Sequence, residues 1–148
     1  MLDEFRSAAL PAGVTIVPVE IEVAEQFDEA FATILRERAD ALMVASTGVT
    51  YQHSARIVTF ASESRLPAIY GTREPVDAGG LMSYGPSAQG IYRQMASTVD
   101  KYLRGAKIGE LPTEQPTTFE FIINAKTARS LGLTIEPNLL TLADEVIE

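Results

Sequence analysis

An unbroken apolar run at residues 41–45 (Ala-Leu-Met-Val-Ala) limits the fold more than any other feature of this chain. The run has the length of a β-strand, shows no alternation of apolar and polar residues, and ends at the small polar turn Ser46-Thr47-Gly48. Strands with one face in water alternate, whereas strands of a parallel sheet are covered on both faces and read as continuous apolar runs. The run therefore predicts a buried strand in a parallel sheet.

Helical and strand patterns alternate around this run. Apolar residues recur at helical spacing over about 24–38 and about 50–64, which predicts one amphipathic helix on each side of the strand. The β-branched residues at 14–19 predict an earlier strand, and Leu-Pro-Ala-Ile-Tyr at 66–70 predicts a later one. This β-α-β-α-β order is typical of an α/β fold with a parallel sheet flanked by helices.

The pattern loosens after Tyr70. Glycines and prolines at 71–80 predict a loop, and Leu-Met-Ser-Tyr at 81–84 predicts a short strand. Ser87 can cap a long helix that ends near Gly105. We expect one apolar stripe of this helix to be buried, and its members are Ile91, Met95, Val99, Tyr102 and Leu103.

Glycine and proline at 105–117 predict an extended crossing segment, followed by a strand at 119–123 and a short helix capped by Asn124. A terminal helix is predicted over 137–146. Residues 2–10 predict a helix with no strand before it. Because the most buried strand of an α/β domain usually comes early, we expect an N-terminal part of a larger protein to precede this segment.

Length and charge exclude several classes of function. The chain has 148 residues, which suits one domain, and its 12 basic against 20 acidic residues give a net charge of −8. This charge repels phosphate backbones, so we expect no nucleic-acid partner. No apolar run approaches the roughly 18 residues of a membrane span. Leu2-Asp3-Glu4 is acidic where a signal peptide would be basic, so neither membrane insertion nor a signal peptide is predicted in this chain.

The sequence contains none of the motifs of hydrolase nucleophiles, zinc proteases, phosphate loops or dinucleotide sites. It has no cysteine, and the acidic residues between 20 and 29 lack a glycine-turned loop that would gather them around a cation. His53 is the only histidine. It is either an ordinary helix histidine or a group beside a ligand at a strand end. An enzyme that uses His53 with a carboxylate has no nucleophile motif to support it, so we expect no catalysis, no metal and no cofactor.

Residues after the strand at 66–70 are candidates for ligand binding. Arg73 and Glu74 form either an exposed ion pair in a linker, or a site in which Arg73 binds a ligand carboxylate and Glu74 binds an ammonium or hydroxyl group. Tyr51, Tyr70 and Tyr84 fall near strand ends. They are either core-edge residues or the walls of a site for an apolar or aromatic ligand.

Several segments carry a family resemblance. They are Phe-Asp-Glu-Ala-Phe-Ala at 27–32, Leu-Pro-Ala-Ile-Tyr at 66–70, Ala-Gly-Gly-Leu-Met-Ser-Tyr-Gly at 78–85, and the tail from Leu111 with Ile-Asn-Ala-Lys-Thr-Ala-Arg-Ser-Leu-Gly-Leu at 123–133. From about residue 5 to the end, the chain resembles ABC-transporter substrate-binding proteins of the tryptophan/tyrosine-binding-like group. The resemblance implies a three-layer, Rossmann-like fold of the periplasmic-binding-protein type I kind, of which this chain is the C-terminal half.

The resemblance also implies a division of the chain. Residues 1–70 would form most of the second ligand-binding lobe, residues 71–118 a hinge or crossing segment whose long helix belongs to the first lobe, and residues 119–148 a strand and helices that complete the lobes. In the family, the turn after the second-lobe strand and the loop after Tyr70 face the cleft. The implied ligand contacts are Ser46, Thr47, Gly48, Tyr51, Tyr70, Arg73, Glu74 and Tyr84.

The function that follows from the resemblance is that of a solute-binding component of an ABC import system. It would act in the periplasm or another extracytoplasmic space, bind an amino acid or an aromatic or carboxylate compound between two lobes, and deliver it to ABC permease subunits. The alternative is a ligand-sensing domain of a transcriptional regulator, which shares the two-lobed fold. We also expect the chain by itself to pair with a second copy, because it would expose apolar surface to water.

Overall fold

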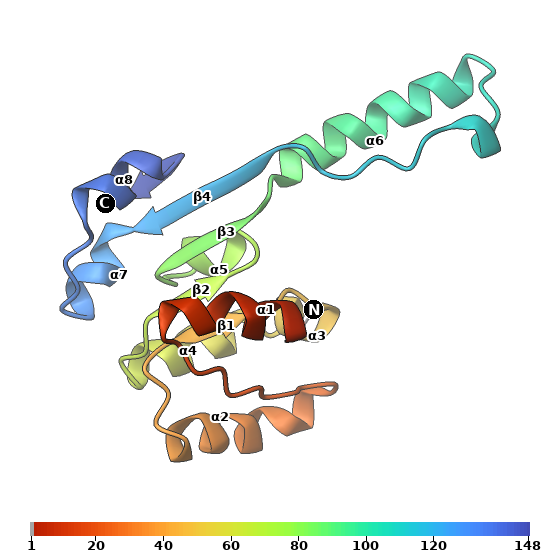
Figure 1. Cartoon of the computed structure of the whole chain (residues 1–148). Coiled ribbons are helices and arrows are strands. Elements are labelled where there is room, and N and C mark those ends of the chain that lie inside the picture. Colours follow the sequence, from red (N-terminus) through yellow and green to blue (C-terminus); the bar gives the residue numbers. More distant parts are fainter. Residues whose placement is uncertain (1) are drawn as a thin grey trace.

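A five-stranded sheet organises the computed structural model, which describes residues 2–148 (Figure 1). Its strands lie in the order β1-β2-β3-β4-β5, with β1, β2 and β3 parallel, β4 antiparallel to β3, and β5 parallel to β4. The strands are β1 (Leu42–Val44), β2 (Ala68–Tyr70), β3 (Met82–Pro86), β4 (Phe119–Asn124) and β5 (Glu145–Ile147). The predicted α/β class with a mostly parallel sheet is confirmed, and β1 and β2 form within the two runs that predicted them. The prediction that the strand at 41–45 is buried is wrong, because β1 lies at one edge of the sheet formed by residues 2–148 and its Met43 is 62% exposed.

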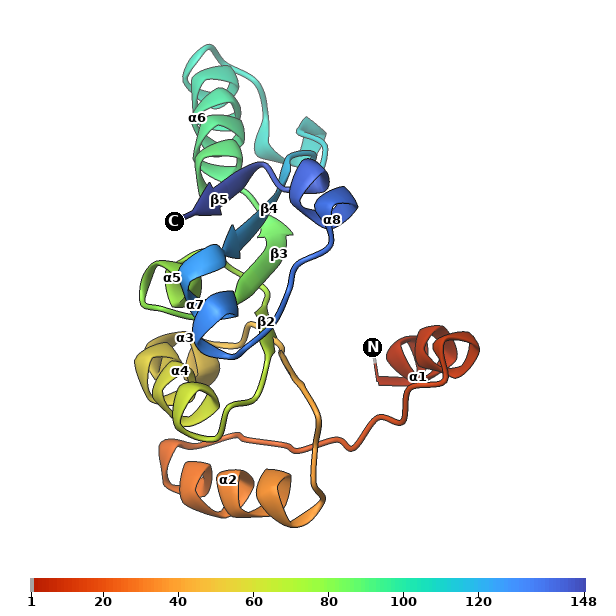
Figure 2. The same cartoon turned by 90° about the vertical axis from the view of Figure 1, so that its left-hand side faces the viewer.

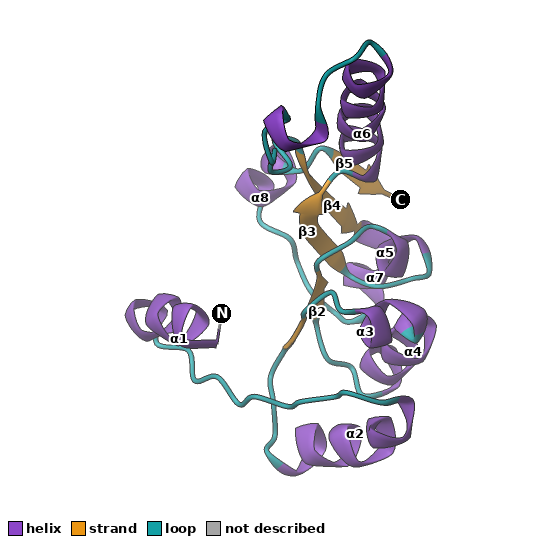
Figure 3. Ribbon diagram, turned by 90° about the vertical axis from the view of Figure 1, so that its right-hand side faces the viewer, coloured by secondary structure: helices purple, strands orange, loops and turns teal. Residues whose placement is uncertain are grey.

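Helices lie on both sides of this sheet. Figures 2 and 3 show α3 (Gly48–Gln52), α4 (Ser54–Glu63), α5 (Glu74–Asp77) and α7 (Ala125–Ser130) on one side, and α1 (Leu2–Ala9) and α8 (Pro137–Leu142) on the other, with α1 standing apart from the strands. The remaining helices are α2 (Phe27–Arg36) and α6 (Ala88–Leu103), with single 3-10 turns at Leu10–Ala12, Ala24–Gln26 and Ile108–Glu110.

The core lies between α2, α4 and the sheet. Apolar residues one helical turn apart on α4, Ile57 and Ala61, pack in one cluster with Ala68 and Tyr70, which alternate on the same face of β2. Phe27 of α2 is fully buried in this cluster. The neighbouring Phe31 stacks on Phe60 of α4, with ring centroids 4.0 Å apart.

The helix predicted over 50–64 is two helices that meet at His53. The His53 amide donates to the Val49 carbonyl and ends α3, while the His53 carbonyl accepts from the Ile57 amide and begins α4. The backbone of His53 is not helical, with φ −106° and ψ 21°. Its ring packs against Phe27 with centroids 5.3 Å apart. Before the break, Thr50 of α3 donates its hydroxyl to the Ala45 carbonyl, just after the end of β1.

Strands β3 and β4 form a ribbon that joins the body to α6. They pair over five positions, from Met82↔Ile123 to Pro86↔Phe119. Beyond them α6 projects away from the sheet (Figure 1). The expectation that one stripe of α6 is buried is wrong for the described chain, because none of its residues is buried. Only the segment that follows α6 runs back along it, where Glu114 contacts Gln94 and Lys101.

Two further predictions are wrong for physical reasons. Residues 14–19 are extended but belong to no strand, because no other segment within residues 2–148 pairs with them. The terminal helix predicted over 137–146 ends at Leu142. After it, Asp144 exchanges two hydrogen bonds with the backbone of Phe121, at 2.7 and 2.8 Å, and aligns β5 beside β4.

Candidate functional site

A hollow lies at the carboxyl ends of β1 and β2, bordered by α3, α4 and α5. The space that it encloses is about 10 Å³, so the described wall by itself holds no more than about one water molecule. Four of its polar residues carry short hydroxyl side chains, and the described chain contributes no charged residue to its lining. The lining residues are Val44, Ala45, Ser46, Thr50, Tyr51, Ser54, Ile57, Tyr70, Gly71, Thr72 and Pro75.

The turn between β1 and α3 shapes one wall. Thr47 caps α3: its Oγ1 accepts from the Thr50 amide at 3.2 Å, and the Thr47 amide donates to Thr50 Oγ1 at 2.8 Å. Thr50 also donates its hydroxyl to the Ala45 carbonyl at 2.7 Å. These hydrogen bonds hold the turn at the end of β1, where Ser46 and the half-exposed Tyr51 border the same hollow.

Tyr70 forms the floor. Only 3% of its surface is exposed, and its hydroxyl has no hydrogen-bond partner within residues 2–148. A Cβ on Gly80 would lie 2.6 Å from Cε2 of the ring, so Gly80 is required for Tyr70 to lie where it does. Burial disfavours the phenolate and raises the pKa of Tyr70 to about 12. At neutral pH Tyr70 is therefore a neutral member of the core cluster whose side chain borders the hollow.

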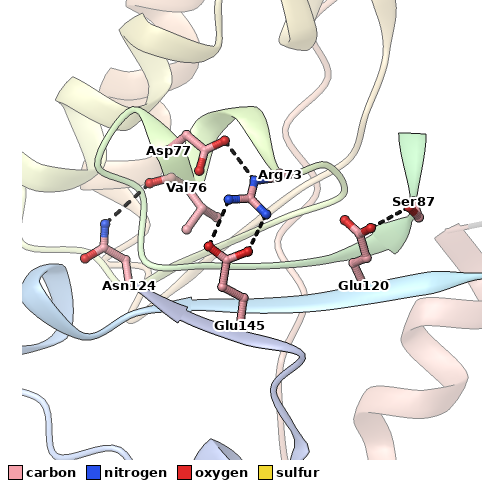
Figure 4. A network of polar contacts seen from close by, with 7 residues as sticks. All are labelled: Arg73, Val76, Asp77, Ser87, Glu120, Asn124 and Glu145. Carbon is pink, nitrogen blue, oxygen red and sulfur yellow. Dashed lines mark hydrogen bonds and ion pairs between the residues drawn. The ribbon is translucent and has the colours of Figure 1, made fainter. Parts of the chain in front are cut away.

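Arg73 directly follows the hollow's rim and binds two carboxylates of the protein (Figure 4). Its Nη1 and Nη2 donate to the two carboxylate oxygens of Glu145 on β5, at 2.5 and 3.0 Å, and its Nε donates to Asp77 at 3.0 Å. The hydrogen bonds from Arg73 lower the pKa of Glu145 below its usual range. The partner of Arg73 is therefore not the adjacent Glu74, which is exposed.

The structure brings together three of the eight predicted ligand contacts. Ser46, Tyr51 and Tyr70 line the hollow. Thr47 and Gly48 lie in the turn beside it without lining it, and Arg73 and Glu74 lie just beyond the rim.

Tyr84 lies apart from the other two predicted tyrosines. Side chains alternate along β3, and its neighbours Ser83 and Gly85 are the buried ones, with Ser83 paired to Tyr70. Tyr84 therefore faces the opposite side of the sheet from Tyr70. There it contacts Phe119 and Phe121, with ring centroids 5.8 and 6.3 Å away.

Sequence reasoning missed three hydroxyl residues of the hollow: Thr50, Ser54 and Thr72. A signal for two of them was present, because in the helix predicted over 50–64 residues four apart, such as Thr50 and Ser54, lie on one side. In the structure the two belong to separate helices that both border the hollow. Thr72 had no such pattern. It is recognisable only from the closeness of the ends of β1 and β2, which pair in parallel from Leu42↔Ala68 to Val44↔Tyr70.

Other kinds of site find little support in the described part of the chain. Over residues 2–148, no three His, Asp or Glu side chains gather in a way that could hold a metal ion. His53 is half-buried against Phe27 and does not line the hollow. None of the helices between residues 2 and 148 is long and apolar enough to cross a bilayer.

A hollow at the carboxyl ends of parallel strands is where open α/β folds place a ligand. Residues 1–147 match the family model for ABC transporter substrate binding proteins. The chain belongs to this family, as its sequence pattern indicated. Among curated proteins, none matches the sequence.

Solved structures with the same fold are about twice as long as this chain. An ABC domain in complex with L-Trp from Streptococcus pneumoniae has a TM-score of 0.88 at 25% identity over 99% of this chain and 49% of its own. A conserved domain protein from Vibrio cholerae has a TM-score of 0.87 at 21% identity, covering 98% and 49%. A ligand-free, open substrate binding protein with adhesive properties from Clostridium difficile has a TM-score of 0.66 at 18% identity, covering 99% and 48%. The chain thus spans about half the length of the structures it matches.

Proposed function

We propose that this chain supplies one wall of a solute-binding site, and that the protein delivers a small molecule to the permease of an ABC import system. The observation that carries the proposal is the hydroxyl-lined hollow at the ends of β1 and β2, in a chain of the ABC transporter substrate-binding family. The family match favours transport over the sensory domain of a transcriptional regulator. Binding without catalysis, outside the cytoplasmic membrane, is part of the same proposal.

The chemistry of the hollow indicates the part of a ligand that it would accept. Ser46, Ser54 and Thr72 offer hydroxyl groups that donate or accept hydrogen bonds, and Tyr51 offers a ring whose surface is 52% exposed. The lining contains no charge within the described chain. As one wall of a larger site, this surface would therefore contact a neutral, partly aromatic portion of a ligand. Thr47, Gly48, Glu74 and Tyr84 stay predictions as ligand contacts.

Transport requires a second wall, which we propose comes from polypeptide equivalent to the other half of the matched structures. In this scheme residues 1–70 belong to one lobe, 71–118 cross between lobes and carry α6 into the other, and 119–148 complete both. Ligand binding would close the lobes because the ligand contacts both walls only in the closed state. Without that second wall, the exposed stripe of α6 would pair with a second copy of the chain.

L-tryptophan, the ligand of one matched structure, is the first probe. Titration into the ¹⁵N-labelled 148-residue chain should shift the amide signals of residues 46–51 and 71–72, and leave those of 105–110 unchanged. A single wall binds weakly, and NMR detects millimolar affinity. Tyr51→Ala should weaken binding about tenfold, the effect of losing about 1.4 kcal/mol of ring contact.

The matched control is Tyr92→Ala on α6, which removes another exposed tyrosine (70% exposed, against 52% for Tyr51) far along the chain from the hollow and should leave the affinity unchanged. A panel of other amino acids, aromatic acids and small carboxylates extends the test. Absence of shifts at 46–51 and 71–72 with every member of the panel would contradict the proposal.

A further inference from the structure

The sequence led us to expect that Arg73 binds the carboxylate of a ligand. In the structure it binds the carboxylate of Glu145 instead. Its planar guanidinium forks onto the Glu145 carboxylate through Nη1 and Nη2, the two-bond geometry that arginine adopts with carboxylates. Its third donor, Nε, is held by Asp77, one turn along α5. Figure 4 shows the guanidinium between these two carboxylates. Three hydrogen bonds fix the side chain in one direction, toward β5.

The partners of this contact come from distant parts of the chain. Arg73 and Glu145 are 72 residues apart, and in the sheet order two strands, β3 and β4, separate β2 from β5. The link therefore spans the sheet from the end of β2 to its last strand. Two other side-chain hydrogen bonds join these regions: the Asn124 amide donates to the Val76 carbonyl at 3.4 Å, and Thr127 donates to the Gly79 carbonyl at 2.9 Å. Apolar packing also joins them, because the buried Val76 shares a cluster with Ile122 of β4, and Ile147 of β5 packs against that cluster.

The segment that Arg73 anchors is a wall of the hollow. Thr72 and Pro75 line the hollow and stand one and two residues from Arg73 in the chain. The Arg73 carbonyl accepts from the amides of Val76 and Asp77, at 2.8 and 3.2 Å, and so begins α5. Any displacement of Arg73 therefore moves the backbone of residues 72–75.

We propose that Arg73 is a positioning residue, which through its fork on Glu145 holds the 72–75 wall of the hollow against the sheet and does not itself bind the ligand. The ligand part of this inference rests on the proposed function, whereas the mechanical part does not. The inference reverses the role that the sequence suggested for Arg73. It also gives Glu145, which no sequence pattern singled out, a part in the site.

The mechanical test is hydrogen exchange of the 148-residue chain, read at the amides of residues 71–78. Glu145→Gln keeps the shape of the side chain and removes its charge. It should speed exchange of these amides about two- to five-fold, the range that an exposed ion pair supplies. Glu145→Asp, which keeps the carboxylate, should recover part of the protection. In an Arg73→Ala background, Glu145→Gln should add nothing further.

The control is Glu63→Gln at the exposed end of α4, which removes the same charge away from the network and should leave residues 71–78 unchanged. Unchanged exchange in Glu145→Gln, or additive effects of Arg73→Ala and Glu145→Gln, would overturn the proposal. The circular dichroism spectrum of each variant verifies that it is folded.

L-tryptophan binding gives a second readout. For this readout, a positioning role and a ligand-binding role of Arg73 predict opposite effects of Glu145→Gln on affinity. If Arg73 positions the wall, Glu145→Gln loosens the wall and weakens binding. If Arg73 is a ligand anchor, the same change frees the guanidinium for the amino acid's carboxylate and tightens binding, which would overturn the proposal. A wild-type chain that binds neither L-tryptophan nor any panel compound contradicts the proposed function, and the exchange experiment then still decides the role of Arg73.

Discussion

Gly85 of β3 lies directly against the carbonyl of Gly71 at the end of β2: a Cβ added to Gly85 would stand 1.9 Å from the Gly71 oxygen. The two strands can approach this closely only because residue 85 has no side chain. Gly71 is itself in contact with the hydroxyl of Ser46, which would lie 2.6 Å from a Cβ at position 71. The ends of β1, β2 and β3 are thus brought together by two glycines at the rim of the hollow.

Gly85→Ala should therefore destabilise the fold. The added methyl group meets backbone, which cannot move aside as a flexible side chain does, and overpacking of this kind costs about 1–3 kcal/mol. Urea denaturation measures the loss. The control is Gly109→Ala, because a Cβ at Gly109 meets nothing within 4 Å. Equal midpoints for Gly85→Ala and the wild type would show that β2 and β3 do not approach as described.

Tyr70→Phe should leave the protein as stable as the wild type or more stable by up to about 1 kcal/mol. The hydroxyl is buried and has no partner within residues 2–148, so its removal relieves a desolvation cost and breaks no hydrogen bond of the described chain. Thermal denaturation at pH 7 measures the difference. A loss of 1 kcal/mol or more would show that the hydroxyl is hydrogen-bonded, for example to a buried water.

The same variant gives a pH signature. The pKa of Tyr70 is raised to about 12 in the folded state, against an ordinary value near 10, so the unfolded chain releases this proton first as the pH rises. The wild type should lose stability relative to Tyr70→Phe as the pH rises from 10 to 12. A constant difference between the two proteins over that interval would contradict a buried, neutral Tyr70.

The sequence predicted the parts of the fold that depend on local pattern. The apolar runs that became β1 and β2 were recognisable as strands because they are short, continuous and apolar. Only β2 is largely buried, since β1 lies at one edge of the sheet formed by residues 2–148 and its Met43 is 62% exposed. The break at His53 was not recognisable, because helical periodicity does not report the backbone angles of one residue. The break is accompanied by a contact between His53 and Phe27, which lies 26 residues earlier in the chain.

The site was predictable only in part for a similar reason. The turn after β1 was found from its position at a strand end, and Ser46 and Tyr51 do line the hollow. The pairing of Arg73 with Glu145 depends on how five strands are ordered, and nothing local in either residue's surroundings indicates the other. Likewise the stripe on α6 revealed an apolar face but not which part of the molecule would cover it.

The contribution of Glu145 to stability should depend on pH. Its folded pKa is lowered by the hydrogen bonds from Arg73, so its contribution is complete above the unfolded value of about 4.3 and is lost as the pH falls through the folded pKa. The melting temperature of the wild type should exceed that of Glu145→Gln at pH 7, and the gap between the two should narrow as the pH is lowered below the unfolded pKa. Glu63→Gln serves as the charge control, and a gap that persists undiminished at pH 3 would contradict the ion pair.

The 148-residue chain should self-associate through α6. Five large apolar or aromatic residues on one side of this helix are between 52% and 76% exposed: Tyr92, Met95, Val99, Tyr102 and Leu103. Contact with a second copy removes this surface from water. Sedimentation equilibrium should give a dimer whose dissociation depends on protein concentration.

A charge placed in the middle of this stripe distinguishes α6 from other contacts. Val99→Lys should shift the equilibrium to the monomer and change the stability of the monomer by less than about 0.5 kcal/mol, because residue 99 is exposed and contributes to no core. Ser97→Lys, two residues away and on the opposite side of the helix, adds the same charge and should leave the dimer intact. A wild-type chain that stays monomeric at all concentrations, or equal dissociation of the two lysine variants, would contradict pairing through this stripe.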